Sequence, residues 1–162
     1  MILVTVGGVV EFKFERIFKI VDELCDEGIL EGNEIIAQCG FNDYVPRNYK
    51  AFDFLSAEEF KKLVSKSEFV ISHAGTGTVV SAVKEGKKVI IFPRLAKYNE
   101  HLDNHQLELC ELFEKSKYAL VAHNKKELIA CIQKIPDFTP AKFVSNNQRI
   151  VDLIISCMEN RG

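Results

Sequence analysis

Short apolar runs alternate along this chain with longer segments in which apolar residues recur every three or four positions. Parallel strands joined by crossover helices produce this alternation. Two runs, 69–71 and 89–92, are apolar at every position, as expected of strands covered by helices on both faces. The sequence therefore predicts an α/β fold, a Rossmann-like, doubly wound parallel sheet of about six strands. The expected strands lie near 2–6, 34–39, 50–54, 69–72, 88–92 and 118–122.

Helices are expected between these strands. In the first, apolar residues from Phe14 to Cys25 recur at helical spacing. After the last strand, a proline-bounded break precedes another helical pattern that starts at about 143. No linker divides the chain, so 1–162 is expected to form a single domain, with this last helix on another surface. The other expected helices cover roughly 56–66, 76–86, 101–115 and 125–134.

Charge and composition exclude several classes of function. The formal net charge is −2 and the lysines and arginines form no run, so no nucleic-acid-binding surface is expected. The five cysteines contain no CxxC pair and fall mostly at apolar positions, which is typical of buried thiols in a reducing cytoplasm. No stretch reaches the ~20 apolar residues of a membrane-spanning helix, and Gly7 ends the first run too early for a signal peptide. We expect a cytoplasmic protein whose membrane contact is peripheral.

The loops that follow the strands are the candidate ligand sites, because open parallel sheets bind ligands outside the carboxyl ends of their strands. The first such loop begins with Gly7 and Gly8. It lacks the GxGxxG spacing and a GK[ST] signature, so neither a nicotinamide cofactor site nor a P-loop is expected. Two interpretations stay open: a tight turn into the helix, or a place where a ligand approaches the backbone.

The loop after the fourth expected strand reads SHAGTGT. Gly75 and Gly77 leave backbone N–H groups uncovered at the start of a helix, where the helix dipole adds partial positive charge. A phosphate could bind there without a lysine. The alternative is a well-capped helix with Thr76 or Thr78 as the capping residue, which explains the hydroxyls but not the glycines or His73.

The loop after the fifth expected strand places amide, carboxylate, imidazole and guanidinium groups around the expected first turns of a helix. These groups suit a ligand that is rich in hydroxyls. His101 and His105 stand four positions apart with Asp103 between them, which raises the alternative of a zinc site. No third ligand follows at metal-binding spacing, so we expect no metal.

Three consecutive stretches carry a resemblance to a known family. SHAGTGT at 72–78, VVSAVKEGKKVIIFPR ending at Arg94, and LAKYNEHLDNHQLEL at 95–109 resemble the C-terminal, donor-binding domain of the glycosyltransferase family that includes the peptidoglycan GlcNAc transferase. The residue pattern is most similar to that of the soluble subunits of split enzymes. These are the subunits of bacterial capsule and exopolysaccharide transferases and that of the eukaryotic lipid-linked chitobiose synthase. The resemblance implies one half of a GT-B fold, in which this half binds the nucleotide-sugar and the other half binds the acceptor.

The resemblance also implies a nucleotide site. The loop of Phe54, Leu55 and Ser56 resembles the uracil pocket, where backbone groups beside Leu55 would read the edge of the base. Many relatives carry a ribose-binding glutamate where this chain has Ser81, so the ribose contact falls to Ser81 or a nearby group. The residues that resemble the diphosphate cradle are Gly75, Thr76, Gly77 and Thr78. Further donor contacts are expected at Gly7, Gly8 and Arg94.

Two residues are candidates for catalysis. Gln106 is the strongest single candidate in the motif that resembles the binding site for the sugar hydroxyls and the nearby phosphate. His73 is the other, either as a general base or, in the favoured interpretation, as a group that orients or contacts the phosphate. The sugar-binding motif is matched by Asp103, Asn104, His105 and Gln106.

The implied reaction is an inverting displacement at the anomeric carbon, with UDP as the leaving group and a lipid-linked saccharide as acceptor. A membrane-associated partner subunit would hold the acceptor and normally the general base. No Asp-x-Asp pair is present, and a helix N-terminus can stabilise the diphosphate charge, so we expect no metal and no cofactor. The alternatives are a non-catalytic subunit that stabilises or regulates its partner, and a nucleotide-dependent oxidoreductase, which the missing GxGxxG disfavours. The sequence leaves glucose, galactose, GlcNAc and glucuronate open as the donor sugar.

Overall fold

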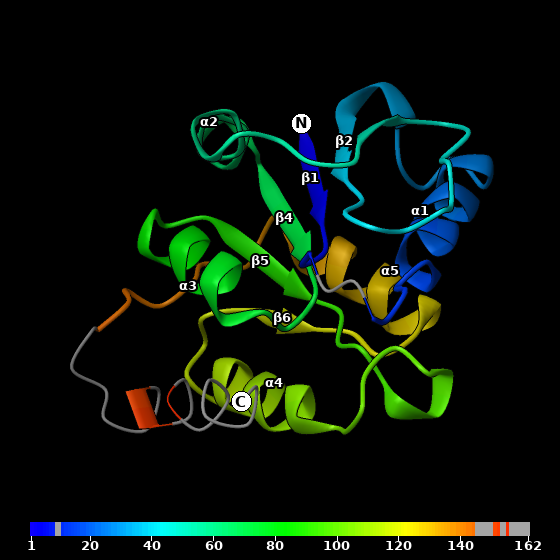
Figure 1. The fold of residues 1–162 in the computed structure, drawn as a ribbon. Coiled ribbons are helices and arrows are strands. Elements are labelled where there is room, and N and C mark those ends of the chain that lie inside the picture. Colours follow the sequence, from blue (N-terminus) through cyan, green and yellow to red (C-terminus); the bar gives the residue numbers. More distant parts are fainter. Residues whose placement is uncertain (9–10, 145–150, 153–154, 156–162) are drawn as a thin grey trace.

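The computed structural model describes residues 1–8, 11–144, 151–152 and 155. In this part of the chain, parallel strands form one six-stranded sheet in the order β3-β2-β1-β4-β5-β6 (Figure 1). The predicted α/β, Rossmann-like architecture is therefore confirmed. The strands are β1 (Ile2–Thr5), β2 (Ile35–Gln38), β3 (Lys50–Phe52), β4 (Phe69–Ser72), β5 (Lys88–Ile91) and β6 (Leu120–Val121).

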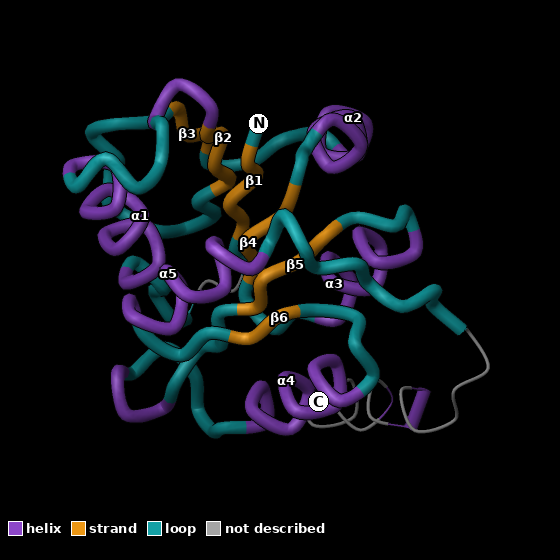
Figure 2. Tube along the Cα trace, turned by 180° about the vertical axis from the view of Figure 1, so that it is seen from behind, coloured by secondary structure: helices purple, strands orange, loops and turns teal. Residues whose placement is uncertain are grey.

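Helices cover both faces of the sheet. Helices α1 and α5 lie side by side on one face, whereas α2, α3 and α4 cover the other (Figures 1 and 2). The strand β1 shows the alternation that this arrangement requires, because Ile2 and Val4 pack toward α1 and Leu3 packs toward α3. The helices are α1 (Arg16–Asp26), α2 (Ala57–Lys66), α3 (Thr76–Lys84), α4 (His105–Lys115) and α5 (Lys125–Lys134).

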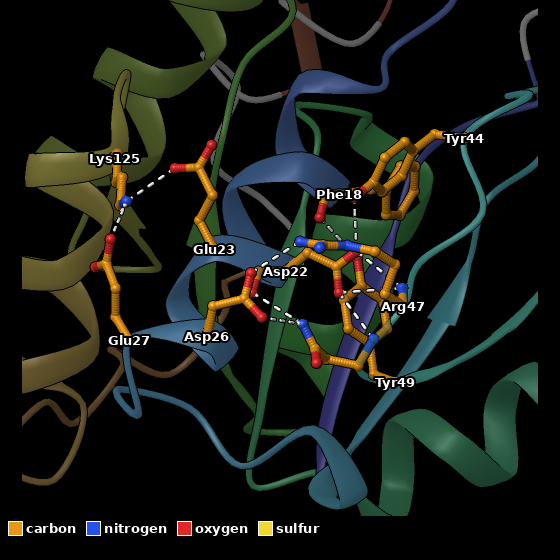
Figure 3. A network of polar contacts seen from close by, with 10 residues as sticks. Phe18, Asp22, Glu23, Asp26, Glu27, Tyr44, Arg47, Tyr49 and Lys125 are labelled. Carbon is orange, nitrogen blue, oxygen red and sulfur yellow. Dashed lines mark hydrogen bonds and ion pairs between the residues drawn. The ribbon is translucent and has the colours of Figure 1, made fainter.

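The connection from β2 to β3, residues 39–49, runs without a helix and is held by one buried carboxylate. Asp22 of α1 is fully buried and accepts hydrogen bonds from the Tyr44 hydroxyl at 2.6 Å and from the backbone N–H groups of Arg47 and Asn48 at 2.9 and 3.0 Å (Figure 3). Burial by itself raises the pKa of a carboxyl, but these hydrogen bonds outweigh it and hold the pKa of Asp22 below its ordinary value. The loop is thus fixed to the outer helix layer.

The predicted start of α4 is wrong by four residues. The helix was expected from 101 and begins at His105. Asp103 accepts the backbone N–H of His105 at 3.0 Å, which bends the chain before the helix instead of continuing it. Leu102, expected in the apolar stripe of this helix, is instead 79% exposed.

The helix predicted from about 143 is wrong at its start. Phe143 and Val144 have no helical backbone. The Phe143 ring packs against Tyr118 with 5.2 Å between ring centroids, and the Tyr118 hydroxyl accepts the N–H of Val144 at 3.3 Å. Positions 151, 152 and 155 are helical, and the rest of the predicted helix lies outside the described residues. None of the helices in the described ranges is long and apolar enough to cross a membrane.

The cysteines follow the sequence prediction in the part that the structure describes. Cys39, Cys110 and Cys131 are buried and Cys25 is half-buried, whereas Cys157 lies outside the described residues. Burial raises the pKa of Cys39 and Cys110 to about 12 and that of Cys131 to about 11. These three groups therefore stay protonated thiols at neutral pH.

Candidate functional site

The candidate residues gather where the sheet changes direction. From β1, the strands β2 and β3 extend to one side and β4, β5 and β6 to the other. The loops after β1 and β4 therefore flank a topological switch point, which is where open α/β sheets bind their ligands. Both predicted glycine loops lie at this point.

The imidazole of His73 is held between the glycines of these two loops. The backbone N–H of Gly7 donates to Nδ1 of His73 at 3.2 Å. A Cβ built on Gly7 would come within 2.8 Å of Nε2 of His73, and one built on Gly75 would overlap the same atom. Both glycines are therefore required to admit the ring. This packing explains Gly75, which helix capping left unexplained, and gives Gly7 a structural role as well.

The contact with Gly7 also fixes the tautomer of the His73 ring. A backbone N–H can only donate, so Nδ1 accepts and the proton of the neutral ring lies on Nε2. In this state neither nitrogen is free to take a proton from an acceptor hydroxyl. The geometry favours a ring that orients the loop or donates to a phosphate over a ring that acts as a general base.

The start of α3 offers backbone N–H groups that no side chain caps. Its N-cap is Gly75, and neither Thr76 nor Thr78 caps it, so the alternative of a threonine-capped helix is wrong. Among the described residues, the N–H groups of Thr76, Gly77 and Thr78 have no acceptor. Ser56 and Glu59 form a capping box on α2 and Asn124 caps α5, whereas α1 and α4, like α3, have no side-chain cap. The α3 terminus, which lies at the switch point, is thus a candidate binding place for an anion.

The ribose candidate Ser81 lies on the same helix. Its side chain is exposed, five positions after the first residue of α3. Hence it can be reached by a ligand, and its predicted role stays a prediction.

Arg94 is buried behind the first glycine loop. Its guanidinium is 1% exposed and donates to the carbonyl oxygens of Phe12 at 3.0 Å, Glu100 at 3.3 Å and Gly7 at 3.4 Å. The group also lies 5.0 Å from the centroid of the Phe14 ring. In this conformation Arg94 supports the loop that carries Gly7 and does not present its charge to a ligand.

Gln106 is joined to the same framework. It is 6% exposed, and its Oε1 accepts the backbone N–H of Arg94 at 2.9 Å. Its Nε2 has no hydrogen-bond partner among the described residues, so one end of the carboxamide is fixed and the other keeps two donors. Those two donors are available to a sugar hydroxyl.

The preceding residues of this motif bond mainly to one another. Asp103 lies 3.2 Å from His101 Nδ1 and 3.5 Å from His105 Nε2. Asn104 accepts the backbone N–H of Ala96 at 3.2 Å and so holds the loop before α4. No group of three or more potential ligands among the described residues is arranged to hold a metal ion.

An ion pair that the sequence did not reveal fixes the loop between β5 and α4. Arg16, at the start of α1, binds Glu100 through two contacts of 2.8 and 2.9 Å. The Arg16 guanidinium also lies 4.5 Å from the Phe92 ring centroid and 4.7 Å from that of Tyr98. Glu100 is buried and accepts the N–H of Leu95 at 2.9 Å as well. Charged residues 84 positions apart give no periodic signal, so only the fold brings them together.

The predicted uracil loop lies beside the first glycine loop. The Phe54 ring packs edge-on against Phe41, with 4.8 Å between centroids, and a Cβ on Gly8 would lie 3.3 Å from Phe54. The N–H of Leu55 already donates to Oε1 of Gln38 at 3.1 Å. In this conformation the Leu55 amide is therefore not available to the edge of a base.

A separate cavity of about 460 Å³ opens between α4 and β6. Of the predicted donor-binding residues it includes Asn104 alone, and none of its lining residues comes from the loops after β1 or β4. It lacks the glycines and uncapped amides of the switch point. We therefore place the candidate site at the switch point and not in this cavity.

Comparison with known proteins identifies relatives of this chain. The model of the family described as "Glycosyltransferase family 28 C-terminal domain" matches residues 1–151. The UDP-N-acetylglucosamine transferase subunit ALG13 of Kluyveromyces lactis is 32% identical over 85 residues, which cover 51% of this chain and 40% of that protein. Its counterpart in Yarrowia lipolytica is 29% identical over 138 residues, or 75% of this chain and 64% of the relative. This chain thus spans less than two thirds of either relative.

Solved structures show the same fold. The NMR solution structure of ALG13 has a TM-score of 0.62 at 25% identity and covers 94% of this chain and 93% of its own. The crystal structure of the glycotransferase of kitacinnamycin has a TM-score of 0.60 at 15% identity, with 38% of that chain covered. The expected correspondence to one half of a larger glycosyltransferase fold is confirmed. The relatives named here give no support to the expected role in capsule or exopolysaccharide synthesis.

Proposed function

Because this chain belongs to the glycosyltransferase family 28 C-terminal domain family, we propose that it is the donor-binding subunit of an inverting glycosyltransferase that uses a UDP-sugar. The observation that carries the proposal is the switch-point site, where the uncapped start of α3 adjoins the His73 ring between two glycine loops. The printed name of the relatives makes UDP-N-acetylglucosamine the first donor to test.

In the proposed reaction, negative charge grows on the diphosphate as the bond to the anomeric carbon breaks. The N–H groups of Thr76, Gly77 and Thr78 would stabilise this charge, together with the partial positive charge of the helix start. The His73 ring, held by the N–H of Gly7, would orient the two glycine loops around the phosphate. This set of neutral donors, with no Asp-x-Asp pair in the chain, supports a metal-independent reaction.

The sugar would lie toward the loop before α4. There the free donors of Gln106 would bind a sugar hydroxyl while its Oε1 holds the backbone of Arg94. An exact position matters because a misplaced sugar lowers the rate of displacement. We therefore assign Gln106 two roles, in binding the sugar and in positioning the loop.

A second subunit would complete the enzyme. The chain corresponds to one half of a two-part fold, and its relatives are named as subunits. We propose that a membrane-associated partner holds a lipid-linked saccharide and supplies the general base, which keeps this chain peripheral to the membrane. The His73 tautomer supports a base on the partner.

Two measurements test the proposal. Calorimetry of the isolated chain with UDP and a chelator should show binding, and the chain combined with an acceptor-binding subunit should transfer sugar from one member of a UDP-sugar panel to a lipid-linked acceptor. Binding that disappears with the chelator would refute the metal-independent site. Stable association with the partner, but without UDP binding, would favour the alternative of a non-catalytic stabilising subunit.

A further inference from the structure

Gln38 is a polar residue at the end of β2. Its side chain is oriented by the loop that follows β3. Its Oε1 accepts the N–H of Leu55 at 3.1 Å. Because that N–H can only donate, the oxygen end of the carboxamide is assigned by the contact. The other end is Nε2, which carries two donors and has no hydrogen-bond partner among the described residues. Gln38 is half-buried, so a ligand can reach it.

An aromatic surface adjoins this carboxamide. Phe54 precedes Leu55 in the chain, and its ring packs edge-on against Phe41. The two side chains are 51% and 43% exposed, so together they present a small aromatic surface to solvent. Gly8 lies against the Phe54 ring, so the loops after β1, β2 and β3 meet here. Exposed aromatic rings beside a fixed amide are suited to a planar base, which can stack and form hydrogen bonds at once.

We propose that Gln38 selects the base of the nucleotide, with Nε2–H donating to O4 of uracil while Leu55 holds the oxygen end. This inference rests on the proposed UDP-sugar function and deepens it. Uracil offers an acceptor at its 4-position, where cytosine has an amino group that can only donate. A cytosine would place donor against donor and leave both groups without a partner, which disfavours it.

The substitution Gln38→Glu tests the assignment, because glutamate keeps an oxygen for the Leu55 N–H and replaces the two donors by an acceptor. Calorimetry gives the dissociation constants of UDP and CDP. The unaltered chain should prefer UDP by at least about tenfold, and Gln38→Glu should lower that ratio by about tenfold or more. The added negative charge weakens both nucleotides alike, so the ratio is the measurement. Gln133→Glu, on the exposed surface of α5, is the matched control and should leave the ratio unchanged.

A second measurement does not depend on the variant folding. The diphosphate of 2-pyrimidinone riboside, which lacks O4, should bind the unaltered chain about tenfold more weakly than UDP. Equal binding of this analogue, or an unchanged UDP to CDP ratio in folded Gln38→Glu, overturns the role of Gln38 while leaving the proposed function intact. If the unaltered chain binds neither UDP nor CDP, the proposed function itself fails, and the role of Gln38 with it.

Discussion

Gly77 offers a direct test of whether the start of α3 binds a ligand. A Cβ built on this glycine meets no atom of the described chain within 4 Å, although the residue lies in the first turn of the helix. Gly77→Ala should therefore fold without strain. Alanine has the higher helix propensity, so the free energy of unfolding should stay equal or rise by up to ~1 kcal/mol.

The same methyl group should weaken UDP binding. If the diphosphate lies on the N–H groups of 76–78, the added methyl stands in its path and displaces it from one or more of them. A hydrogen bond to a charged group contributes ~1.5–3 kcal/mol, so the dissociation constant should rise at least about tenfold. Calorimetry measures the affinity, and urea denaturation measures the free energy of unfolding.

Gly75→Ala is the comparison in the same loop. Its Cβ would overlap Nε2 of His73, so the ring or the backbone must move, and overpacking of this kind costs ~1–3 kcal/mol. This variant should lose both stability and UDP affinity. If Gly77→Ala instead binds UDP as tightly as the unaltered chain, the glycine serves the helix alone and the diphosphate lies elsewhere.

Three further predictions concern the framework of the site. Glu100→Gln removes one member of a largely buried ion pair and leaves the charge of Arg16 without its partner, so urea denaturation should show a loss of about 3 kcal/mol. Asp22→Asn should unfold more easily at neutral pH by ~1–3 kcal/mol. The folded pKa of Asp22 is lowered, so the carboxylate contributes fully to stability above its ordinary pKa of 3.8 and loses that contribution as the pH falls through the folded value. On acidification below about pH 4, Asp22→Asn should therefore lose less stability than the unaltered chain. Gln106→Ala should lose ~1–3 kcal/mol, because the buried N–H of Arg94 loses its acceptor, and should also lose sugar transfer; Gln106→Glu should restore the stability but not the transfer. Sugar transfer at the unaltered rate by either Gln106 variant would contradict the sugar contact.

The alternating strands and helices of this fold were predictable because their apolar residues recur at regular spacing in the sequence. Runs such as Phe69–Val70–Ile71 must be buried on both faces, and that requirement places β4 at the centre of the sheet. The start of α4 was not predictable in the same way. Leu102 falls at helical spacing, but the Asp103 side chain accepts the backbone N–H of His105 and the helix begins only there. The spacing of apolar residues does not reveal such a hydrogen bond between a side chain and the backbone.

The loops of the candidate site could be predicted from sequence, but the contacts that support them could not. Small residues after β4 predicted an anion-binding place there, and one of them, Gly75, also makes room for the His73 ring. Asp22 accepts the backbone N–H of Arg47, and Glu100 binds the Arg16 side chain, although charged residues such as Asp22 and Glu100 are usually exposed. Their partners become apparent only when distant loops are placed against one another.

The proposed function depends on one place, the switch point at the carboxyl edge of the sheet. An NMR titration of the ¹⁵N-labelled chain with UDP, in the presence of a chelator, tests it residue by residue. We predict that the largest shifts fall on the amides of Gly75, Thr76, Gly77 and Thr78, with a second group at Gly7 and Gly8. An unchanged spectrum at millimolar UDP, or shifts confined to the residues of the cavity between α4 and β6, would contradict the account.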